Sequence, residues 1–371
     1  MSPYLSNPIW LITNMPVTQL YALGSNGSGQ LGLGHEDDVS SPTLLQVSAG
    51  IEQHQVRRIT AGGNHTLLVT EAGDVYASGS NVDGRCGLGK GKEQSLYFQK
   101  VRLSTENAQD VVVDTCAATW DASVFATDQG VLVCGTGAKG ELGLGNEVTT
   151  TSEPILIPDF PPPDLEIVDL VACMGHVVAV LSNGDAYGWG VGRHGQLGEL
   201  NEDSWVPRKI QGVPFKAAGV VCGKDFTLLF SSPAEGNFLM LGPSRRDRYN
   251  IRESVPKTLK GWKSVSASWG SIFVLMPNGD IHGWGRNDHG QLPPSNISKV
   301  ASMAAGSEHV LALSSAGRVS AWGWGEHGNC GLPLDSQSDV KGRSNAFELP
   351  FSVATAVWGG CATSFIVVPG E

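Results

Sequence analysis

Short apolar runs separated by glycine-containing turns recur along this chain. The first clear example is AGGNHTLLVTEAGDVYASG (61–79), in which HTLLVT and DVYAS are two such runs joined by a turn. Runs of this composition on either side of a turn predict a β-hairpin. Equivalent hairpins are predicted at ASVFATDQGVLVCG, HVVAVLSNGDAYGWG, SIFVLMPNGDIHGWG and HVLALSSAGRVSAWG. Because no stretch of comparable length has helical periodicity, the fold class is predicted to be all-β.

A glycine-rich segment follows each hairpin, and its copies can be aligned along the whole chain. The first glycine of the segment stands at positions 24, 79, 135, 190, 242, 285 and 323, so seven copies are present. The fifth copy, FLMLGPSRRDRYNI (238–251), is degenerate, with Asp247 in place of the second glycine. Four short strands in each of seven repeats predict a seven-bladed β-propeller, a ring that leaves only short strand edges exposed.

The phase of the repeat predicts how the ring closes. The propeller begins with the third strand of a blade, at about 18–24, and ends with a first and second strand in VATAVWGGCATSFIVV (353–368). The two chain ends should therefore share one blade. Residues 17–371 are predicted to form a single propeller, and residues 1–16 an N-terminal extension with disorder as one option. In an antiparallel meander, the first-to-second and third-to-fourth turns emerge on the same face of the ring.

Two glycine clusters imitate nucleotide-binding motifs. VCGTGAKGELG (133–143) has the G-x-G-x-x-G spacing, but the glycines and prolines after it exclude the helix that a dinucleotide turn requires. GRCGLGKG (84–91) is close to a P-loop, but Gly91 stands where a Ser or Thr would hold magnesium. Both clusters belong to the repeat, so no cofactor is predicted.

Composition narrows the class of partner. A formal charge of −11 and a pI near 5.3 argue against nucleic-acid binding, which needs clustered Lys and Arg. One basic loop, RRDRYNIR (245–252), is an exception, and a solvated turn is favoured there over a binding patch. Seven cysteines without a C-x-x-C pair indicate a reduced protein, expected in the cytoplasm with the nucleus as an additional location. The apolar run PIWLI (8–12) is too short for a membrane span or a secretory core.

The sequence contains no recognised catalytic motif. Ser, His and Asp are abundant but form neither a nucleophile elbow nor an H-E-x-x-H pair, so the protein is not predicted to be an enzyme. His327 and Cys330, with Cys361, could in principle ligate a metal. Burial of the two cysteines is the favoured alternative, and no metal site is predicted.

Tryptophans divide into two groups by their place in the repeat. Trp189, Trp284 and Trp322 fall in third strands and are predicted to pack in the core. Four others are placed in turns of one face, where exposed Trp with charged neighbours is typical of a protein interface. The predicted partner-binding residues are Trp120, Asp121, Lys224, Asp225, Trp269, Glu308, His309, Trp324, Glu326, His327, Asn329 and Trp358.

The shared glycines and the AGGNHT turn resemble the repeat of the regulator-of-chromosome-condensation propeller family over nearly the whole chain. The segments WGWGEHGNCG (322–331) and GGCATSF (359–365), with GKDF, GSEH and the shortened last repeats, are similar to a fungal group within it. That group comprises the alpha-tubulin suppressors, also called killer-toxin-insensitivity protein thirteen.

The resemblance implies a function that the residues alone do not. It implies a heterodimer with the small CSL-type zinc-finger protein, an electron donor for diphthamide formation on elongation factor two and for Elongator, which modifies wobble uridines of transfer RNA. The chain would be a non-enzymatic adaptor that reaches Elongator and the diphthamide machinery indirectly. The wider family suggests an alternative, a guanine nucleotide exchange factor or chromatin-docking propeller for a Ran-type GTPase. The acidic charge and the missing basic N-terminal tail argue against that alternative.

Overall fold

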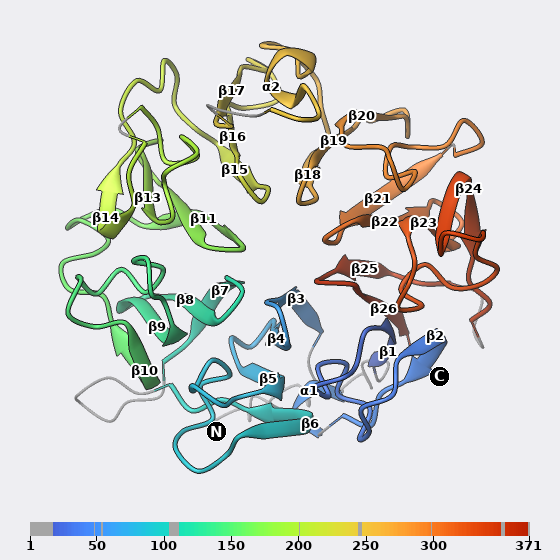
Figure 1. The fold of residues 1–371 in the computed structure, drawn as a ribbon, viewed down its shortest axis with the longest axis horizontal. Helices are drawn as coiled ribbons and strands as arrows, with labels where there is room; N and C mark the ends of the chain where they lie inside the picture. Colours follow the sequence, from blue (N-terminus) through green and yellow to red (C-terminus); the bar gives the residue numbers. More distant parts are fainter. Residues whose placement is uncertain are drawn as a thin grey trace, which may run out of the picture.

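Seven antiparallel sheets are arranged in a ring around a central opening (Figure 1), which confirms the predicted seven-bladed β-propeller. The structure is a computed structural model that describes residues 18–47, 49–52, 55–103, 111–199, 201–243, 247–297, 299–349 and 353–369. Residues 1–16, predicted to be an extension, lie outside these ranges. The two helices within them, α1 (Ala49–Glu52) and α2 (Ile251–Ser254), are single turns, and no described helix is long and apolar enough to cross a bilayer.

Each blade is a meander whose first strand lines the central opening. We number the blades along the chain, starting with the one that joins its ends. Blade one contains β25 (Ala356–Gly359), β26 (Thr363–Pro369), β1 (Thr18–Gly24) and β2 (Val39–Leu44). Blade two contains β3 (Val56–Ala61), β4 (His65–Thr70), β5 (Val75–Ser80) and β6 (Gln94–Lys100). Blade three contains β7 (Val113–Ala118), β8 (Ala122–Thr127), β9 (Gly130–Thr136) and β10 (Thr150–Leu156).

The remaining blades follow in the same order around the ring. Blade four contains β11 (Ile167–Cys173), β12 (His176–Leu181), β13 (Ala186–Gly190) and β14 (Ser204–Lys209). Blade five contains β15 (Gly219–Cys222), β16 (Thr227–Phe230) and β17 (Phe238–Leu241). Blade six contains β18 (Ser264–Ala267), β19 (Ser271–Leu275) and β20 (Ile281–Gly285). Blade seven contains β21 (Val300–Ala305), β22 (His309–Ser314), β23 (Val319–Trp324) and β24 (Asp339–Ala346).

The chain ends close the ring within blade one, as the phase of the repeat predicts. Strand β1 pairs with β26 over its full length, from Thr18 opposite Pro369 to Gly24 opposite Thr363. In Figure 1 the blue β1 and the red β26 accordingly lie side by side. The ladder between the two ends of the chain therefore holds the ring shut.

The prediction of four strands in every blade is wrong for blades five and six, where the described residues form three. In blade five, the Asp247 carboxylate accepts hydrogen bonds from the backbone N–H groups of Ile251 and Arg252, both at 2.9 Å, and α2 follows. Only a single bridge, Asn237 to Thr258, remains where a fourth strand would pair. In blade six, Pro293 and Pro294 follow Leu292 and supply no backbone N–H to a ladder.

The hydrophobic core lies between neighbouring blades. Second strands are buried along their length, as in β4, β12 and β19, because each is covered by a blade on both sides. Trp189 and Trp322 are fully buried, and Trp284 is partly buried against the same kind of cluster, as predicted for all three. The indole N–H groups of Trp189 and Trp322 donate to carbonyls of Glu141 and Gln291 in the preceding blade, at 3.0 and 2.9 Å.

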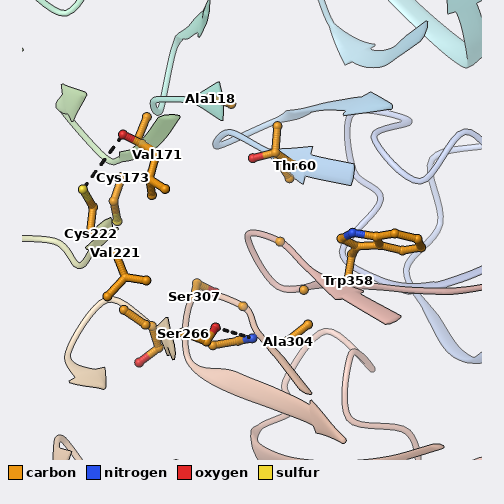
Figure 2. Close-up of a pocket in the computed structure, with 18 of the residues that line it drawn as sticks. Thr60, Ala118, Val171, Cys173, Val221, Cys222, Ser266, Ala304, Ser307 and Trp358 are labelled. Atoms are coloured by element: carbon orange, nitrogen blue, oxygen red, sulfur yellow. Dashed lines mark hydrogen bonds between the residues drawn. The ribbon is translucent and has the colours of Figure 1, made fainter. Parts of the chain in front are cut away.

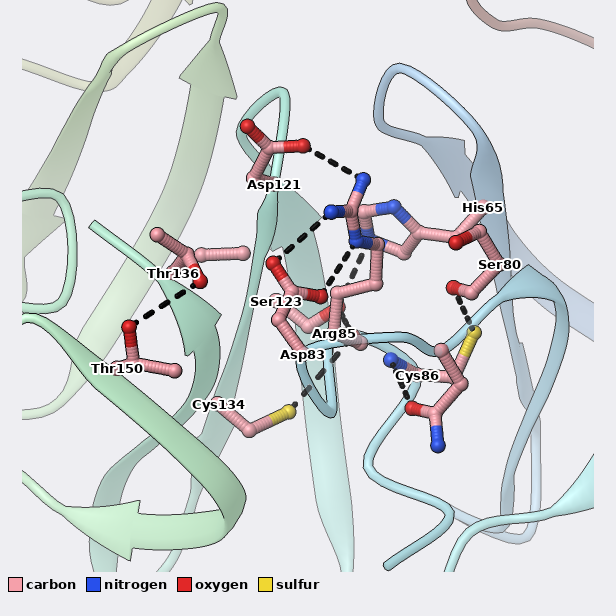
Figure 3. Close-up of polar contacts among 12 residues, drawn as sticks. His65, Ser80, Asp83, Arg85, Cys86, Asp121, Ser123, Cys134, Thr136 and Thr150 are labelled. Atoms are coloured by element: carbon pink, nitrogen blue, oxygen red, sulfur yellow. Dashed lines mark hydrogen bonds and ion pairs between the residues drawn. The ribbon is translucent and has the colours of Figure 1, made fainter. Parts of the chain in front are cut away.

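Three buried histidines join neighbouring blades directly. His65 Nε2 lies 3.0 Å from the Ser123 hydroxyl of the next blade, as Figure 3 shows. The matching pairs are His176 with Thr227, at 3.1 Å, and His309 with Ser364, at 2.9 Å. We call these three contacts the seam.

The surroundings of the seam histidines favour their neutral form, and those of His309 also determine which ring nitrogen carries the proton. The Ser364 hydroxyl donates its only proton to the carbonyl of Asn329, at 2.8 Å, so His309 Nε2 must carry a proton and donate to Ser364. The other ring nitrogen, Nδ1, is buried and has no hydrogen-bond partner. The imidazole of His309 is therefore neutral, with its proton on Nε2. Burial lowers the pKa of His65 to about 3 and that of His176 and His309 to about 4. The folded ring therefore resists protonation of these residues.

Removing residues 353–371 should open the ring, because it strips β25 and β26 from blade one and leaves β1 without its main partner. We expect the truncated chain to lose its cooperative melting transition, measured by circular dichroism. Supplying residues 353–371 as a separate peptide should restore it, and a chain lacking only residues 1–16 should melt like the intact protein. A stable, soluble chain without 353–371 would contradict this account of closure.

Acidification should destabilise the ring through the seam. The folded pKa values of the three histidines lie below the unfolded value of about 6.5, so the unfolded state binds more protons as the pH falls from about 6.5 towards 4. The contribution of the histidines to stability should be fully present above about pH 6.5 and be lost as the pH falls towards their folded pKa values. The loss should reach about 1.4 kcal/mol per pH unit for each histidine. The His309→Gln variant should show a shallower loss of unfolding free energy in urea titrations from pH 7 to 4. Parallel pH profiles for the two proteins would refute this role.

Candidate functional site

The first-to-second turns of the seven blades meet around one mouth of the central channel. Backbone hydrogen bonds of 2.7 to 2.9 Å link the third positions of several of these turns, from Gly63 to Trp120, Trp120 to Met174, Lys224 to Trp269 and Trp269 to Ser307. A further bond runs from Ser307 to Gly360, the second position of the turn in blade one. We call the side chains at the third positions of the seven turns the mouth ring; they are Trp120, Met174, Lys224, Trp269, Ser307 and Cys361, and the third position of the turn in blade two is Gly63. Backbone hydrogen bonds thus position these residues around the mouth, and their side chains differ from one blade to the next.

Two tryptophans of the mouth ring meet across it. The rings of Trp120, from blade three, and Trp269, from blade six, lie with centroids 5.9 Å apart and planes tilted by 47°. These blades are not neighbours, so the pair reaches over the channel. Trp120 is 37% exposed and lies over Gly63, where any Cβ would come within 2.6 Å of its ring. An apolar, solvent-facing surface therefore covers part of the mouth.

Below the mouth, the channel encloses about 520 Å³ and is lined by first strands of the blades. Figure 2 shows Thr60, Ser266, Ser307 and Trp358 on its wall. Burial raises the pKa of Cys361 to about 11, and the pKa of Cys173, also on the wall, is raised well above its ordinary value for the same reason. The wall thus presents hydroxyls and neutral thiols, together with the charged residues Arg57, Arg58 and Asp169.

Charged residues beside the mouth ring are braced by ion pairs. Asp121 lies 2.6 Å from Arg85, which also pairs with Asp83 at 2.7 Å (Figure 3). Glu308 is paired with Arg286 and accepts a hydrogen bond from Gln291 at 2.8 Å. Burial raises the pKa of Glu308, although these two partners favour its charged form.

A second aromatic group lies in the third-to-fourth loops of blades six and seven. Trp324 stacks on His289, with centroids 5.4 Å apart and planes at 26°, and contacts His327 at 6.4 Å. Each histidine is paired with a carboxylate: His289 Nδ1 with Asp339 at 2.9 Å, and His327 Nδ1 with Asp38 at 2.8 Å. This arrangement holds Trp324 half-buried at the surface next to the exposed Glu326.

A separate pocket of about 360 Å³ opens between the loops of blades five and six. It brings together four of the predicted partner-binding residues, Lys224, Asp225, Trp269 and Glu308. The structure therefore places Trp120, Asp121 and these four around the channel mouth, and Trp324, Glu326 and His327 in a neighbouring group on the same face.

Two of the tryptophans predicted in turns lie in strands instead. Trp358 is in β25, opposite Phe365, because the first strand of blade one extends towards the turn, and the residue faces the channel. Trp324 is the last residue of β23 and is paired with Asp339. The candidate contacts His309 and Asn329 are buried: His309 forms the seam, and Asn329 donates to the carbonyl of Trp324 at 2.8 Å. His309 and Asn329 are therefore buried residues that stabilise the loops of this face, and they are not exposed contacts.

The metal alternative considered for His327, Cys330 and Cys361 finds little support in their surroundings. Cys330 is fully buried and its thiol lies 3.5 Å from the carbonyl of Trp324, as favoured from the sequence, while Cys361 is half-buried on the channel wall. Within the described ranges, no three His, Cys, Asp or Glu side chains are grouped so that they could hold a metal ion. Of the basic loop, Arg248 and Arg252 are described, and Arg245 and Arg246 lie outside the described residues.

Sequence reasoning missed several residues that shape the site. Met174 completes the mouth ring, and Tyr249 and Arg286 line the pocket in blades five and six. Met174 could have been found by aligning all seven turns position by position. Tyr249 and Arg286 could not, because their neighbourhood depends on how the degenerate fifth copy folds.

Comparison with known proteins agrees with the fold and the repeat. A family model described as RCC1-like domain matches residues 19–368. The RCC1 repeat-containing protein C10F6.04 of Schizosaccharomyces pombe is 32% identical over 371 residues, covering 94% of this chain and 98% of that protein. The secretion-regulating guanine nucleotide exchange factor of Bos taurus is 28% identical over 367 residues, covering 84% of this chain and 75% of that protein.

Solved structures are similar in fold. Prp20p of Saccharomyces cerevisiae has a TM-score of 0.77 at 20% identity, over 95% of this chain and 92% of that one. Human WBSCR16 has a TM-score of 0.77 at 20% identity, over 95% and 99% of the two chains. The family model matches nearly all of the described ring, and the Schizosaccharomyces pombe protein is 32% identical over 94% of this chain. The chain therefore belongs to the RCC1-like domain family.

Proposed function

We propose that this chain is a non-enzymatic adaptor that binds the small CSL-type zinc-finger protein through the face carrying the mouth ring. In this role it would support diphthamide formation on elongation factor two and the Elongator-dependent modification of wobble uridines, acting in the cytoplasm and also in the nucleus. The observation that carries the proposal is the Trp120–Trp269 pair, which is partly exposed and lies across the centre of one face.

Several features of this face support a protein partner. Exposed aromatic anchors surrounded by polar groups are the usual composition of energetic hot spots in protein interfaces. Asp121 is held in place by its ion pair with Arg85, so it loses little conformational freedom on binding. The choice of the CSL protein rests on the sequence resemblance of segments 322–331 and 359–365. A surface of about 1,600 Å² in total would be expected for a stable heterodimer.

A second candidate function is supported by the relatives. One of them is named a secretion-regulating guanine nucleotide exchange factor, and Prp20p was described together with its binding properties to Gsp1p and histones. An exchange factor or chromatin-docking role for a Ran-type GTPase would use the same kind of ring. The low identities and the acidic charge of this chain make it the weaker of the two proposals.

Replacing either tryptophan of the pair should weaken the complex with the CSL protein without unfolding the ring. We expect Trp120→Ala and Trp269→Ala each to cost about 2 kcal/mol of binding free energy, roughly a 30-fold rise in Kd by calorimetry. Two control variants should bind normally: Trp205→Ala, in the outer strand β14, and Asp128→Lys, in the hairpin turn on the opposite face.

Melting temperatures of the same variants separate binding from stability. Normal affinity with a lowered melting temperature would mean that the tryptophans only seal the blade ends, which contradicts their role as anchors. A wild-type chain that ignores the CSL protein but binds a nucleotide-free Ran-type GTPase would replace the adaptor proposal with the exchange-factor one.

A further inference from the structure

The pocket between the loops of blades five and six exists because the fifth copy of the repeat is degenerate. In most other copies, the glycine at the position of Asp247 has a positive φ and presses its backbone on the next blade. A Cβ at Gly84 would come within 2.2 Å of Ser152, and one at Gly290 within 2.7 Å of Lys341. Asp247 instead accepts hydrogen bonds from the backbone N–H groups at the start of α2, and Arg248 and Tyr249, between Asp247 and α2, line the pocket.

The base of the pocket is apolar and its rim is aromatic. Phe226 and Ile251 are 2% and 3% exposed and form part of its lining, with Tyr249 and Trp269 beside them. Tyr249 is held in place by two guanidinium groups, those of Arg248 and Arg286, each 5.5 Å from its ring centroid. An apolar side chain of a ligand could thus pack against this preformed apolar and aromatic lining.

Three cations and three carboxylates line this pocket, and two of the carboxylates are already engaged by other groups. Glu308 forms an ion pair with Arg286 and accepts a hydrogen bond from Gln291. Asp247 accepts hydrogen bonds from two backbone N–H groups. Among the described residues, the charged groups of Lys224 and Arg248 have no ion-pair partner. Asp225 is the remaining carboxylate, 3.7 Å from His194. In a chain of net charge −11, two cations without an ion-pair partner, which lie beside aromatic side chains, favour an anionic ligand.

We propose that this pocket binds an acidic segment of a protein partner. A carboxylate of the segment would lie between Lys224 and Arg248, and a neighbouring apolar side chain would pack on Tyr249 and Trp269. The inference deepens the proposed function, on which it rests, because the pocket opens on the face of the mouth ring and shares Trp269 with it. The combination of charge and aromatic rim selects acidic residues next to an apolar one.

Selection of random displayed peptides on the immobilised full chain tests this without assuming which partner binds. The wild-type chain should enrich peptides in which Asp or Glu stands beside an aromatic or aliphatic residue. The leading peptide should bind the double variant Lys224→Glu, Arg248→Glu at least about tenfold more weakly by fluorescence anisotropy. The matched variant Arg252→Glu, Lys257→Glu changes the charge by the same amount at exposed residues outside the pocket lining, and it should bind normally.

A third variant keeps the test valid if the double variant folds poorly. Asp225→Asn removes the opposing carboxylate and should tighten binding of the acidic peptide, an effect that a purely structural role would not produce. Enrichment of basic or uncharged peptides, or equal binding by the double variant, would overturn the proposal. Displacement of the peptide by inorganic phosphate, but not by chloride at equal ionic strength, would make the pocket a phosphate site and would also overturn it. Because the peptides are random, the result of the selection can still be interpreted if the CSL protein does not bind.

Discussion

The contact between neighbouring blades is the constraint on which this structure depends. A single antiparallel blade cannot bury both of its faces, so its second strand must be covered on each side by another blade. The seam adds directional hydrogen bonds to this packing, since each histidine lies within hydrogen-bond distance of a hydroxyl on the next blade. The Ser123 and Ser364 hydroxyls donate in turn to the carbonyls of Arg85 and Asn329. Register between blades is thereby fixed by hydrogen bonds inside an otherwise apolar interface. The pairing of β1 with β26 completes the ring.

The same constraint explains where the surface can vary. Residues at the fifth position of each first turn, such as His65 and His309, face the next blade and are buried. Residues two positions earlier, such as Trp120 and Trp269, form backbone hydrogen bonds between blades, and their side chains lie at the channel mouth. Their side chains contribute little to closure, so they can be used for binding. The face of the mouth ring is therefore rigid in its main chain and variable in its chemistry, which suits a docking surface.

Much of the fold could be predicted from the repeat, and the limits of that prediction have physical causes. Blade number and closure follow from the phase of the glycines, because the seven copies must form one ring. The missing fourth strands of blades five and six were not predicted, since a uniform repeat was assumed where Asp247 and Pro293 change the hydrogen bonding. Exposure within a turn was also not resolved: Glu308 and His309 follow Ser307 directly, yet both are buried. The meeting of Trp120 with Trp269 depends on the diameter of the ring, which no local pattern encodes.

Hydrogen–deuterium exchange of the chain alone and in complex with the CSL-type zinc-finger protein tests the central claim most directly. The account predicts that the complex slows exchange in the turns at 119–121, 223–225 and 268–270, which carry the mouth ring and the pocket. Exchange in the hairpin turns of the opposite face, at 127–130 and 182–185, should be unchanged. Slowed exchange confined to that opposite face, with the mouth ring unaffected, would contradict the account.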